Sequence, residues 1–275
     1  MGLRINQNIA ATNAYRNLSV TSGQMEKSLE KLSSGFRINR AADDAAGLAI
    51  SEGLRSQVGG LKQAVRNAQD GVSVVQTAEG ALTEVHSMLQ RVRDLSVQAS
   101  NSGAQNADSL AAIQSEINEL GEAIGDIATR TNFNGTDLLT TAAAATPLTF
   151  HVGAGSTDTL DVQLTDIEAV AAAVALIDVT AAGGGAAGID AADAQITSVS
   201  SARATLGASQ NRLEHTINSL NVAVENLSAS ESRIRDTDMA QEMVSFTRSQ
   251  ILSQAGTAML AQANQAPQGV LQLLR

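Results

Sequence analysis

The stretch ITSVSSARATLGASQNRLEHTINSLNVAVENLSASESRI, residues 196–234, decides the fold of this chain. Steps of three and four residues alternate along it, and nine of the twelve positions with this spacing are apolar. Such a repeat is typical of a helix that packs along one seam against other helices. At about 1.5 Å per residue, this helix would span roughly 58 Å, which predicts a rod. The twelve positions are Ile196, Val199, Arg203, Leu206, Gln210, Leu213, Ile217, Leu220, Val224, Leu227, Glu231 and Ile234.

Two shorter helical patterns precede this stretch, in residues 78–99 and 113–127. The cluster of Asn, Ser and Gly at 101–106 predicts a turn, so the two helices should fold back antiparallel. We expect Asp108 or Ser109 to be the N-cap of the second helix. The predicted fold class is mainly α: a long antiparallel helical rod, or coiled-coil bundle, formed by the N- and C-terminal halves. The seam residues that we single out are Leu82, Leu89, Ile117, Leu206, Leu213, Leu220 and Leu227.

The middle of the chain lacks helical periodicity. Residues 148–152 and 160–164 alternate apolar and polar side chains around a Gly-rich turn, which predicts a β-hairpin. Residues 166–177 suit one short helix, and the glycines of 183–188 predict a flexible loop. We assign 136–190 as a hairpin and variable low-complexity region within the rod.

Both chain ends are amphipathic, yet neither has a partner within the rod. We expect a discontinuous domain of residues 1–42 and 236–275, beside a rod domain of 43–235. A helix with one apolar face is stable only when that face is covered. The ends are therefore expected to be poorly ordered in the monomer and to fold on assembly. The side chains expected to carry that burial are Leu18, Met25, Leu29, Leu32, Phe246, Ile251, Leu260, Leu271 and Leu274.

Composition narrows the classes of function. The 275 residues include no cysteine, which excludes disulfides and thiol chemistry. The net charge is −10, and residues 136–202 hold eight acidic and no basic residues. The basic residues of 1–40 are scattered and lack stacking aromatics, so we expect no nucleic acid partner. The sequence contains no run of about 18 apolar residues, so we expect no membrane span. The N-terminal sequence lacks the apolar core of a secretory signal, so export would need another route.

Patterns for catalysis or cofactor binding are sparse. The glycines of 183–188 match G-x-G-x-x-G, but they lie in low-complexity sequence without βαβ units. His86, His151 and His215 are far apart, and none occurs in H-E-x-x-H. Asp43 and Asp44 are adjacent, so their side chains diverge on a helix, and a helix N-cap explains them better than a carboxylate pair. We therefore expect no enzyme activity, no cofactor and no metal.

Several motifs, in matching order at both ends, resemble those of bacterial flagellins. They cover about residues 1–140 and 190–275. The stretches that carry the resemblance are LRINQNIAA (3–11), LSSGFRIN (32–39), DDAAGLAI (43–50), QRVRDLSVQ (90–98), TNFNG (131–135), RIRDTDMA (233–240) and the C-terminal QANQ to LLR (262–275).

The resemblance implies a secreted structural subunit of the bacterial flagellar filament, used in motility. In this family the chain ends form an inner domain, a helical rod with a hairpin surrounds it, and variable outer domains are inserted mid-chain. The sequence looks like a short member without those outer domains. The resemblance further implies self-assembly into a homopolymer and type III export without a signal peptide. The implied partners are hook-associated junction and cap proteins and a flagellar secretion chaperone at the C-terminal segment.

The resemblance also implies toll-like receptor 5 as a partner in animals. Asp94 stands where the commonly recognised form has Glu, and Ser96 stands where it has Ala. We favour subunit contacts in the filament as the main role of this surface. The residues carried over by their motifs as receptor contacts are Arg91, Leu95, Gln98 and Glu116.

Three other functions are weighed against the filament subunit. A hook-filament junction protein of the same organelle would share the terminal motifs, but does not usually show the match at 90–98. A flagellin that carries a metallopeptidase would need H-E-x-x-H and a larger insert. A stand-alone coiled-coil adhesin would not need amphipathic ends without partners.

Overall fold

The computed structural model describes residues 7–101, 103 and 105–273, and the chain divides into two compact units. Unit 1 joins the chain ends, Met1–Val58 and Asn226–Arg275, and unit 2 is Gly59–Glu225. Unit 1 therefore includes the first turns of one long helix and the last turns of another, beside the chain ends. The predicted division into 1–42 with 236–275 and 43–235 stays a prediction.

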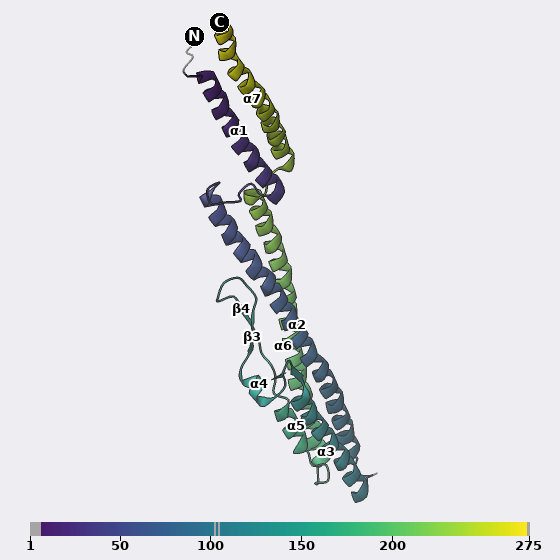
Figure 1. Cartoon of the computed structure of the whole chain (residues 1–275). Helices are drawn as coiled ribbons and strands as arrows, with labels where there is room; N and C mark the ends of the chain where they lie inside the picture. Colours follow the sequence, from purple (N-terminus) through teal and green to yellow (C-terminus); the bar gives the residue numbers. More distant parts are fainter. Residues whose placement is uncertain (1–6, 102, 104, 274–275) are drawn as a thin grey trace. The chain divides into compact units, whose positions relative to one another are not determined.

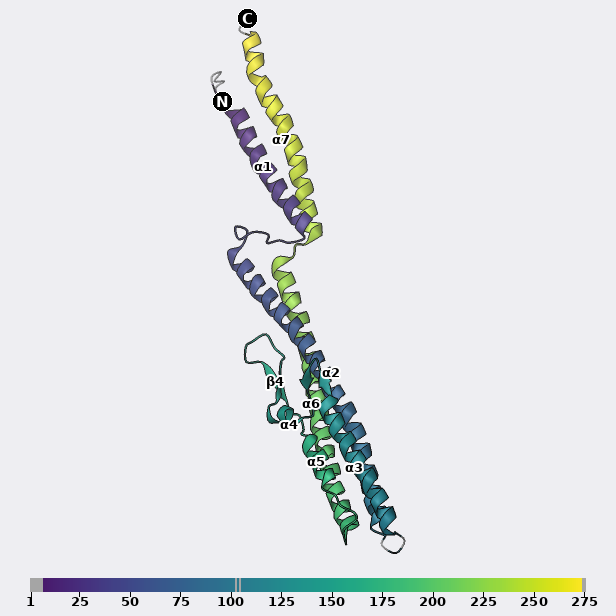
Figure 2. The ribbon, with the colours of Figure 1, turned by 60° about the horizontal axis from the view of Figure 1, so that its bottom comes forward.

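Unit 2 is built mainly from three long helices, of which the first runs antiparallel to the other two (Figures 1 and 2). They are α2 (Ala45–Ala99), α3 (Ala107–Arg130) and α6 (Gly184–Arg235), of which α2 and α6 extend into unit 1. The mainly helical fold is confirmed. The helix predicted over 196–234 is found, but it begins earlier, at Gly184.

The predicted flexible loop at 183–188 is wrong. Residues from Gly184 onward form the first turns of α6, and Gly184, Gly185 and Gly188 are buried. A Cβ on Gly185 would lie 2.6 Å from the backbone N of Ser100, and one on Gly188 would lie 2.9 Å from Ser96 Oγ. These glycines let the start of α6 approach the end of α2 closely, so here glycine serves packing instead of flexibility.

Gly185→Ala is expected to lower the melting temperature of unit 2. Alanine favours a helix over glycine by about 1 kcal/mol, but the new methyl would collide with backbone atoms of Ser100, and such overpacking costs about 1–3 kcal/mol. Thermal unfolding followed by circular dichroism measures the net effect. Gly207→Ala is the control on the same helix, because a Cβ at Gly207 meets nothing within 4 Å. A Gly185→Ala protein that gains stability as Gly207→Ala does would contradict this account of the contact.

The N-cap of α3 is Asn106, so the prediction of Asp108 or Ser109 is wrong. The Asn106 side chain accepts a hydrogen bond from Ser109 N at 2.7 Å, and Ser109 Oγ accepts one from Asn106 N at 3.0 Å. This reciprocal pair is a capping box in which Ser takes the place of the usual Glu. The preceding turn, predicted at 101–106, includes positions 102 and 104, which lie outside the described residues.

The region between α3 and α6 contains two hairpins, of which one was predicted. The predicted hairpin is confirmed, and its register pairs Leu148 with Val162 and Phe150 with Leu160. The other hairpin, which was not predicted, turns at Asn134 (φ 50°) and Gly135 (φ 80°). Asn-Gly suits this left-handed turn and was the available signal. The elements are β1 (Asn132–Phe133), β2 (Thr136–Asp137), α4 (Thr141–Ala145), β3 (Leu148–His151), β4 (Thr159–Val162) and α5 (Glu168–Ala175).

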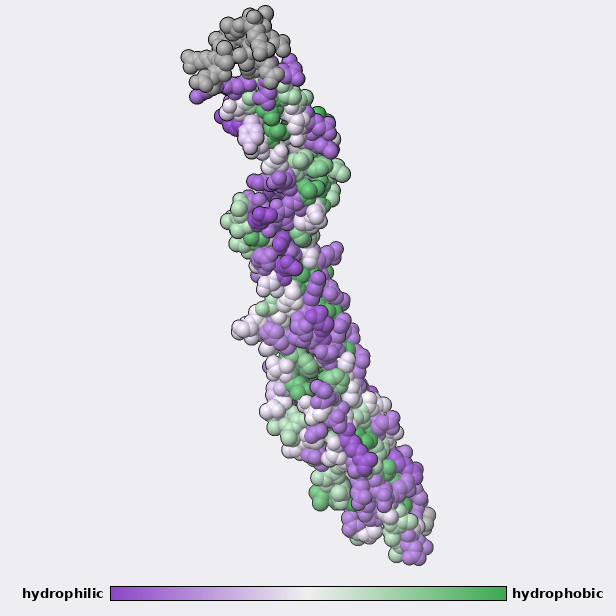
Figure 3. Space-filling model, in the orientation of Figure 1, coloured by the Kyte–Doolittle hydropathy of each residue, from purple (hydrophilic) through white to green (hydrophobic). Residues whose placement is uncertain are grey.

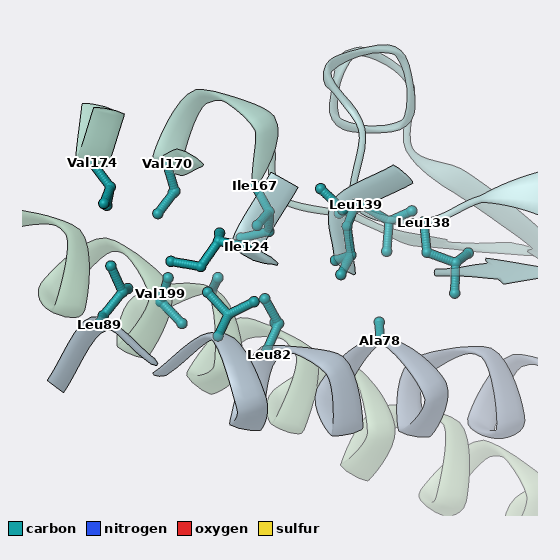
Figure 4. Close-up of a cluster of buried hydrophobic side chains, with 14 of the residues drawn as sticks. Ala78, Leu82, Leu89, Ile124, Leu138, Leu139, Ile167, Val170, Val174 and Val199 are labelled. Atoms are coloured by element: carbon teal, nitrogen blue, oxygen red, sulfur yellow. The ribbon is translucent and has the colours of Figure 1, made fainter. Parts of the chain in front are cut away.

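The core of unit 2 lies where this region covers the three helices. Figure 4 shows Leu138, Leu139 and Ile167 pointing toward Leu82 and Ile124, and all five are fully buried. Five of the seven singled-out seam residues belong to the same core: Leu82, Leu89, Ile117, Leu206 and Leu213. The remaining two, nearer the C-terminal end of α6, are half-buried: Leu220 and Leu227.

Candidate assembly site

The chain ends form a pair of antiparallel helices in unit 1, α1 (Ile9–Ser34) and α7 (Met239–Leu273), as Figures 1 and 2 show. At one end of the pair, Asn8 Nδ2 donates to the carbonyl oxygen of Ala263 at 2.7 Å. At the other end, Lys31 Nζ lies 3.9 Å from Glu242 Oε2. Asn8 also caps α1, since its side chain accepts a hydrogen bond from Ala11 N.

Small residues bring α1 and α7 close together. A Cβ on Gly256 would lie 3.3 Å from Leu18 Cδ1, which is close contact. Ser28 on α1 and Ser249 on α7 are each only 7% exposed. Small side chains at a helix crossing allow the backbones to approach, and this contact buries only a narrow strip of each helix. Five of the nine residues expected to carry terminal burial are half-buried: Leu18, Met25, Leu32, Phe246 and Leu260.

The rest of α7 presents an apolar surface to solvent. Ile251 is 61% exposed, and Leu29 on α1 is 56% exposed. In Figure 3, apolar atoms lie open among polar ones over α1 and α7. We call the following residues of α7, which line one groove, the α7 face: Ala240, Met243, Val244, Thr247, Arg248, Ile251 and Leu252. Exposed apolar patches of this kind mark interaction sites.

Only part of this surface could be predicted from the sequence. Ile251 was predicted to carry terminal burial, but Val244 and Leu252 were not singled out, although all three are more than half exposed. The signal was present, because an apolar residue recurs on this side of α7 at steps of one, seven and eight residues. Leu274 and the side chain of Leu271 lie outside the described residues.

A second surface lies on unit 2, where the receptor contacts were expected. Arg91 and Glu116 form an exposed ion pair between α2 and α3, with Arg91 Nη2 2.6 Å from Glu116 Oε1. Gln98 is exposed as well. Leu95, however, is only 2% exposed and packs in the core, because it faces the other helices of unit 2. Of the four residues carried over, three therefore lie on the surface and Leu95 does not.

The two adjacent carboxylates at the start of α2 have separate structural roles. Asp44 Oδ1 accepts a hydrogen bond from Gly47 N at 2.8 Å, as an N-cap does. Asp43 accepts hydrogen bonds from the backbone N–H groups of Arg40 and Asn39, which lower the pKa of its carboxyl. Their hydrogen bonds hold Asp43 and Asp44 to different backbone groups, so no paired catalytic carboxylates arise here.

Charged pairs also join α2 to α6. Arg93 Nε lies 2.6 Å from Asp193 Oδ1, and this hydrogen bond raises the pKa of the Arg93 guanidinium. Arg203 Nε lies 2.8 Å from Glu79 Oε1.

Over the part of the chain that the structure describes, no cluster of three potential metal ligands occurs. Within the same ranges, no helix has the length and apolarity that crossing a membrane requires.

Long antiparallel helices, paired chain ends and an exposed apolar face define a class of helical proteins built for contacts between chains. The family model for the bacterial flagellin N-terminal helical region matches residues 5–144, and that for the C-terminal helical region matches residues 189–274. A flagellin of Halalkalibacterium halodurans is 54% identical over 273 residues, which are 98% of this chain and 99% of that protein. The chain belongs to the bacterial flagellin family and is a structural subunit of the flagellar filament.

Solved structures agree with this assignment. The crystal structure of Bacillus cereus flagellin shares 30% identity with a TM-score of 0.51, over 56% of this chain and 88% of that one. A putative flagellar hook-associated protein from Vibrio parahaemolyticus gives a TM-score of 0.59 over 70% of this chain and 100% of that one, at 14% identity. The second likeness shows the fold alone, so the junction-protein alternative has less support.

Proposed function

We propose that the chain polymerises by folding its terminal helices and burying the α7 face against neighbouring copies. The exposure of that face carries the proposal. The contact between α1 and α7 covers one side of α7 and leaves Met243, Ile251 and Leu252 at least half exposed. Apolar burial supplies about 25 cal/mol per Å², whereas ordering each residue costs about 1–2 kcal/mol. Because α1 covers only one side of α7, we expect the terminal helices to become fully ordered only when other copies cover the α7 face.

Ile251→Asp is expected to abolish filament growth without changing the fold of the monomer. Its side chain is 61% exposed, so a charge there remains hydrated in the free chain but would be buried in the assembled face at a cost of several kcal/mol. Purified monomer is mixed with sheared filament seeds and ammonium sulfate, which strengthens apolar burial, and is then imaged by electron microscopy.

The matched control is Gln250→Asp, which places the same charge on the next residue, an exposed position outside the groove. The unsubstituted chain and this control should form long filaments, and their helicity should rise on assembly. Filaments from Ile251→Asp, or assembly without a gain in helicity, would contradict the proposed mechanism.

Further roles rest on the family and are proposals for this chain. The α7 face would need cover before assembly, which a secretion chaperone at the C-terminal segment would provide. Export through the type III apparatus to an extracellular filament would follow, with junction and cap proteins at its ends. We propose no enzyme activity, because the family is structural. For Arg91, Gln98 and Glu116, subunit contacts are the favoured role, and toll-like receptor 5 is the second.

A further inference from the structure

The two connectors of unit 1 are joined to each other. One runs from the end of α1 at Gly35 to the start of α2, and the other links α6 to α7. Gly35 adopts φ 76° and ends α1. Phe36 and Asp236 then form an isolated antiparallel bridge, in which Arg37 N donates to Arg235 O at 2.6 Å and Thr237 N donates to Gly35 O at 3.0 Å.

Arg235, the last residue of α6, holds this bridge from one side. Its Nη1 lies 2.6 Å from Glu52 Oε1 on α2, and its guanidinium carbon lies 4.8 Å from the centre of the Phe36 ring. The Arg235 side chain is only 13% exposed, whereas that of Glu52 is 52% exposed. The Arg235 side chain thus contacts both α2 and the connector after α1. The backbone of Arg235 continues directly into the connector before α7.

The burial of Arg235 increases the importance of these contacts. Its Nε is buried and has no hydrogen-bond partner among the described residues. A guanidinium that is partly removed from water is attracted more strongly to a carboxylate and to an aromatic face, because the local dielectric constant is lower. Removing Glu52 would leave the largely buried Arg235 guanidinium without its charged partner, whereas Glu52, which is 52% exposed, would stay hydrated if Arg235 were removed.

We propose that Arg235 is a positioning residue for filament assembly, because it latches the two connectors to α2 and so holds side by side the points from which α1 and α7 fold. The inference rests on the proposed function of the α7 face. Two free connectors would let each terminal helix sample many directions, and this freedom would be lost on assembly. With the latch closed, less conformational entropy remains to be lost when a neighbouring copy covers the α7 face.

Arg235→Gln is therefore expected to raise the critical concentration for seeded polymerisation about tenfold, which corresponds to about 1.4 kcal/mol per added subunit. Helicity and melting temperature of unit 2 should not change. Arg233→Gln is the matched control: it removes the same charge two residues earlier on α6, where the exposed Arg233 donates a hydrogen bond to Ser230 Oγ of its own helix.

A double-mutant cycle separates the latch from a general loss of charge. If the ion pair acts as one device, adding Glu52→Gln to Arg235→Gln should raise the critical concentration little further. In filaments grown from Arg235→Gln, the amides of Arg37 and Thr237 should exchange with solvent faster than in Arg233→Gln filaments. This readout reports on the bridge itself.

Additive effects of Glu52→Gln and Arg235→Gln would overturn the latch. So would an Arg235→Gln protein that polymerises and exchanges as Arg233→Gln does. The failure of the proposed function looks different, because Ile251→Asp would then form filaments as the unsubstituted chain does, and the positioning role that rests on the α7 face would fall with it.

Discussion

Leu213→Asp is expected to leave unit 2 unfolded at 25 °C. Leu213 is fully buried in the core of unit 2, and its Cδ1 would lie 3.3 Å from a Cβ on Gly71 of α2. The substitution removes apolar burial worth about 2–5 kcal/mol and places an unpaired carboxylate in the core, at a further cost of several kcal/mol. Typical domains are stable by about 5–15 kcal/mol, so the sum consumes most or all of the stability.

Circular dichroism and denaturant titration measure this loss. Leu220→Asp is the graded control, because Leu220 follows seven residues later on the same seam but is only half-buried. Its carboxylate can reach water, and a smaller loss of stability is expected. Equal effects of the two substitutions, or unchanged helicity in Leu213→Asp, would show that the seam of α6 is misplaced.

Removal of residues 239–275 is expected to abolish polymerisation and to leave unit 2 folded. The deletion takes away α7, and α1 then loses the helix that covers Leu18. The core of unit 2 consists of α2, α3, α6 and the segments between them, so none of its buried residues lies in the deleted segment. The change should therefore lower total helicity without shifting the cooperative melting transition of unit 2.

The comparison uses seeded polymerisation of the truncated and full-length chains, with thermal unfolding in parallel. The full-length chain should grow from seeds, whereas the truncated chain should not do so at any attainable concentration. Filaments from the truncated chain would show that the α7 face is dispensable. A truncated chain without a cooperative transition would instead show that unit 2 depends on the chain ends.

The long helices could be predicted because their periodicity is local and continuous. The seam at 196–234 lies within one helix, and alternation in 148–152 was enough for the hairpin. Gly185 was wrongly assigned to a loop, because glycine suits both a flexible loop and a close contact between helices. Only the presence of a neighbouring helix distinguishes the two cases. Leu95 was carried over from a motif, which gives a sequence position but not the side on which the residue faces.

The assembly site was only partly predictable for a related reason. An amphipathic pattern identifies an apolar face, yet both Phe246, which is half-buried, and Ile251, which is exposed, belong to α7 and fit such a pattern. Which of them packs on α1 depends on where the small residues Ser249 and Gly256 permit a close approach. Arg235 is still harder to find, since its partners Phe36 and Glu52 lie about 200 residues away in sequence.

The close packing at the start of α6 also determines where foreign sequence can be grafted. Gln114 on α3 holds the preceding segment, because its Nε2 donates to Ile177 O and its Oε1 accepts from Val179 N, both at 2.8 Å. Gly184 and Gly185 are buried on the other side, whereas residues 180–183 are exposed. A peptide inserted between Ala181 and Ala182 would thus lie on the surface, with a fixed segment on each side of it. The same peptide inserted three residues later, between Gly184 and Gly185, would disrupt the contact between α6 and α2.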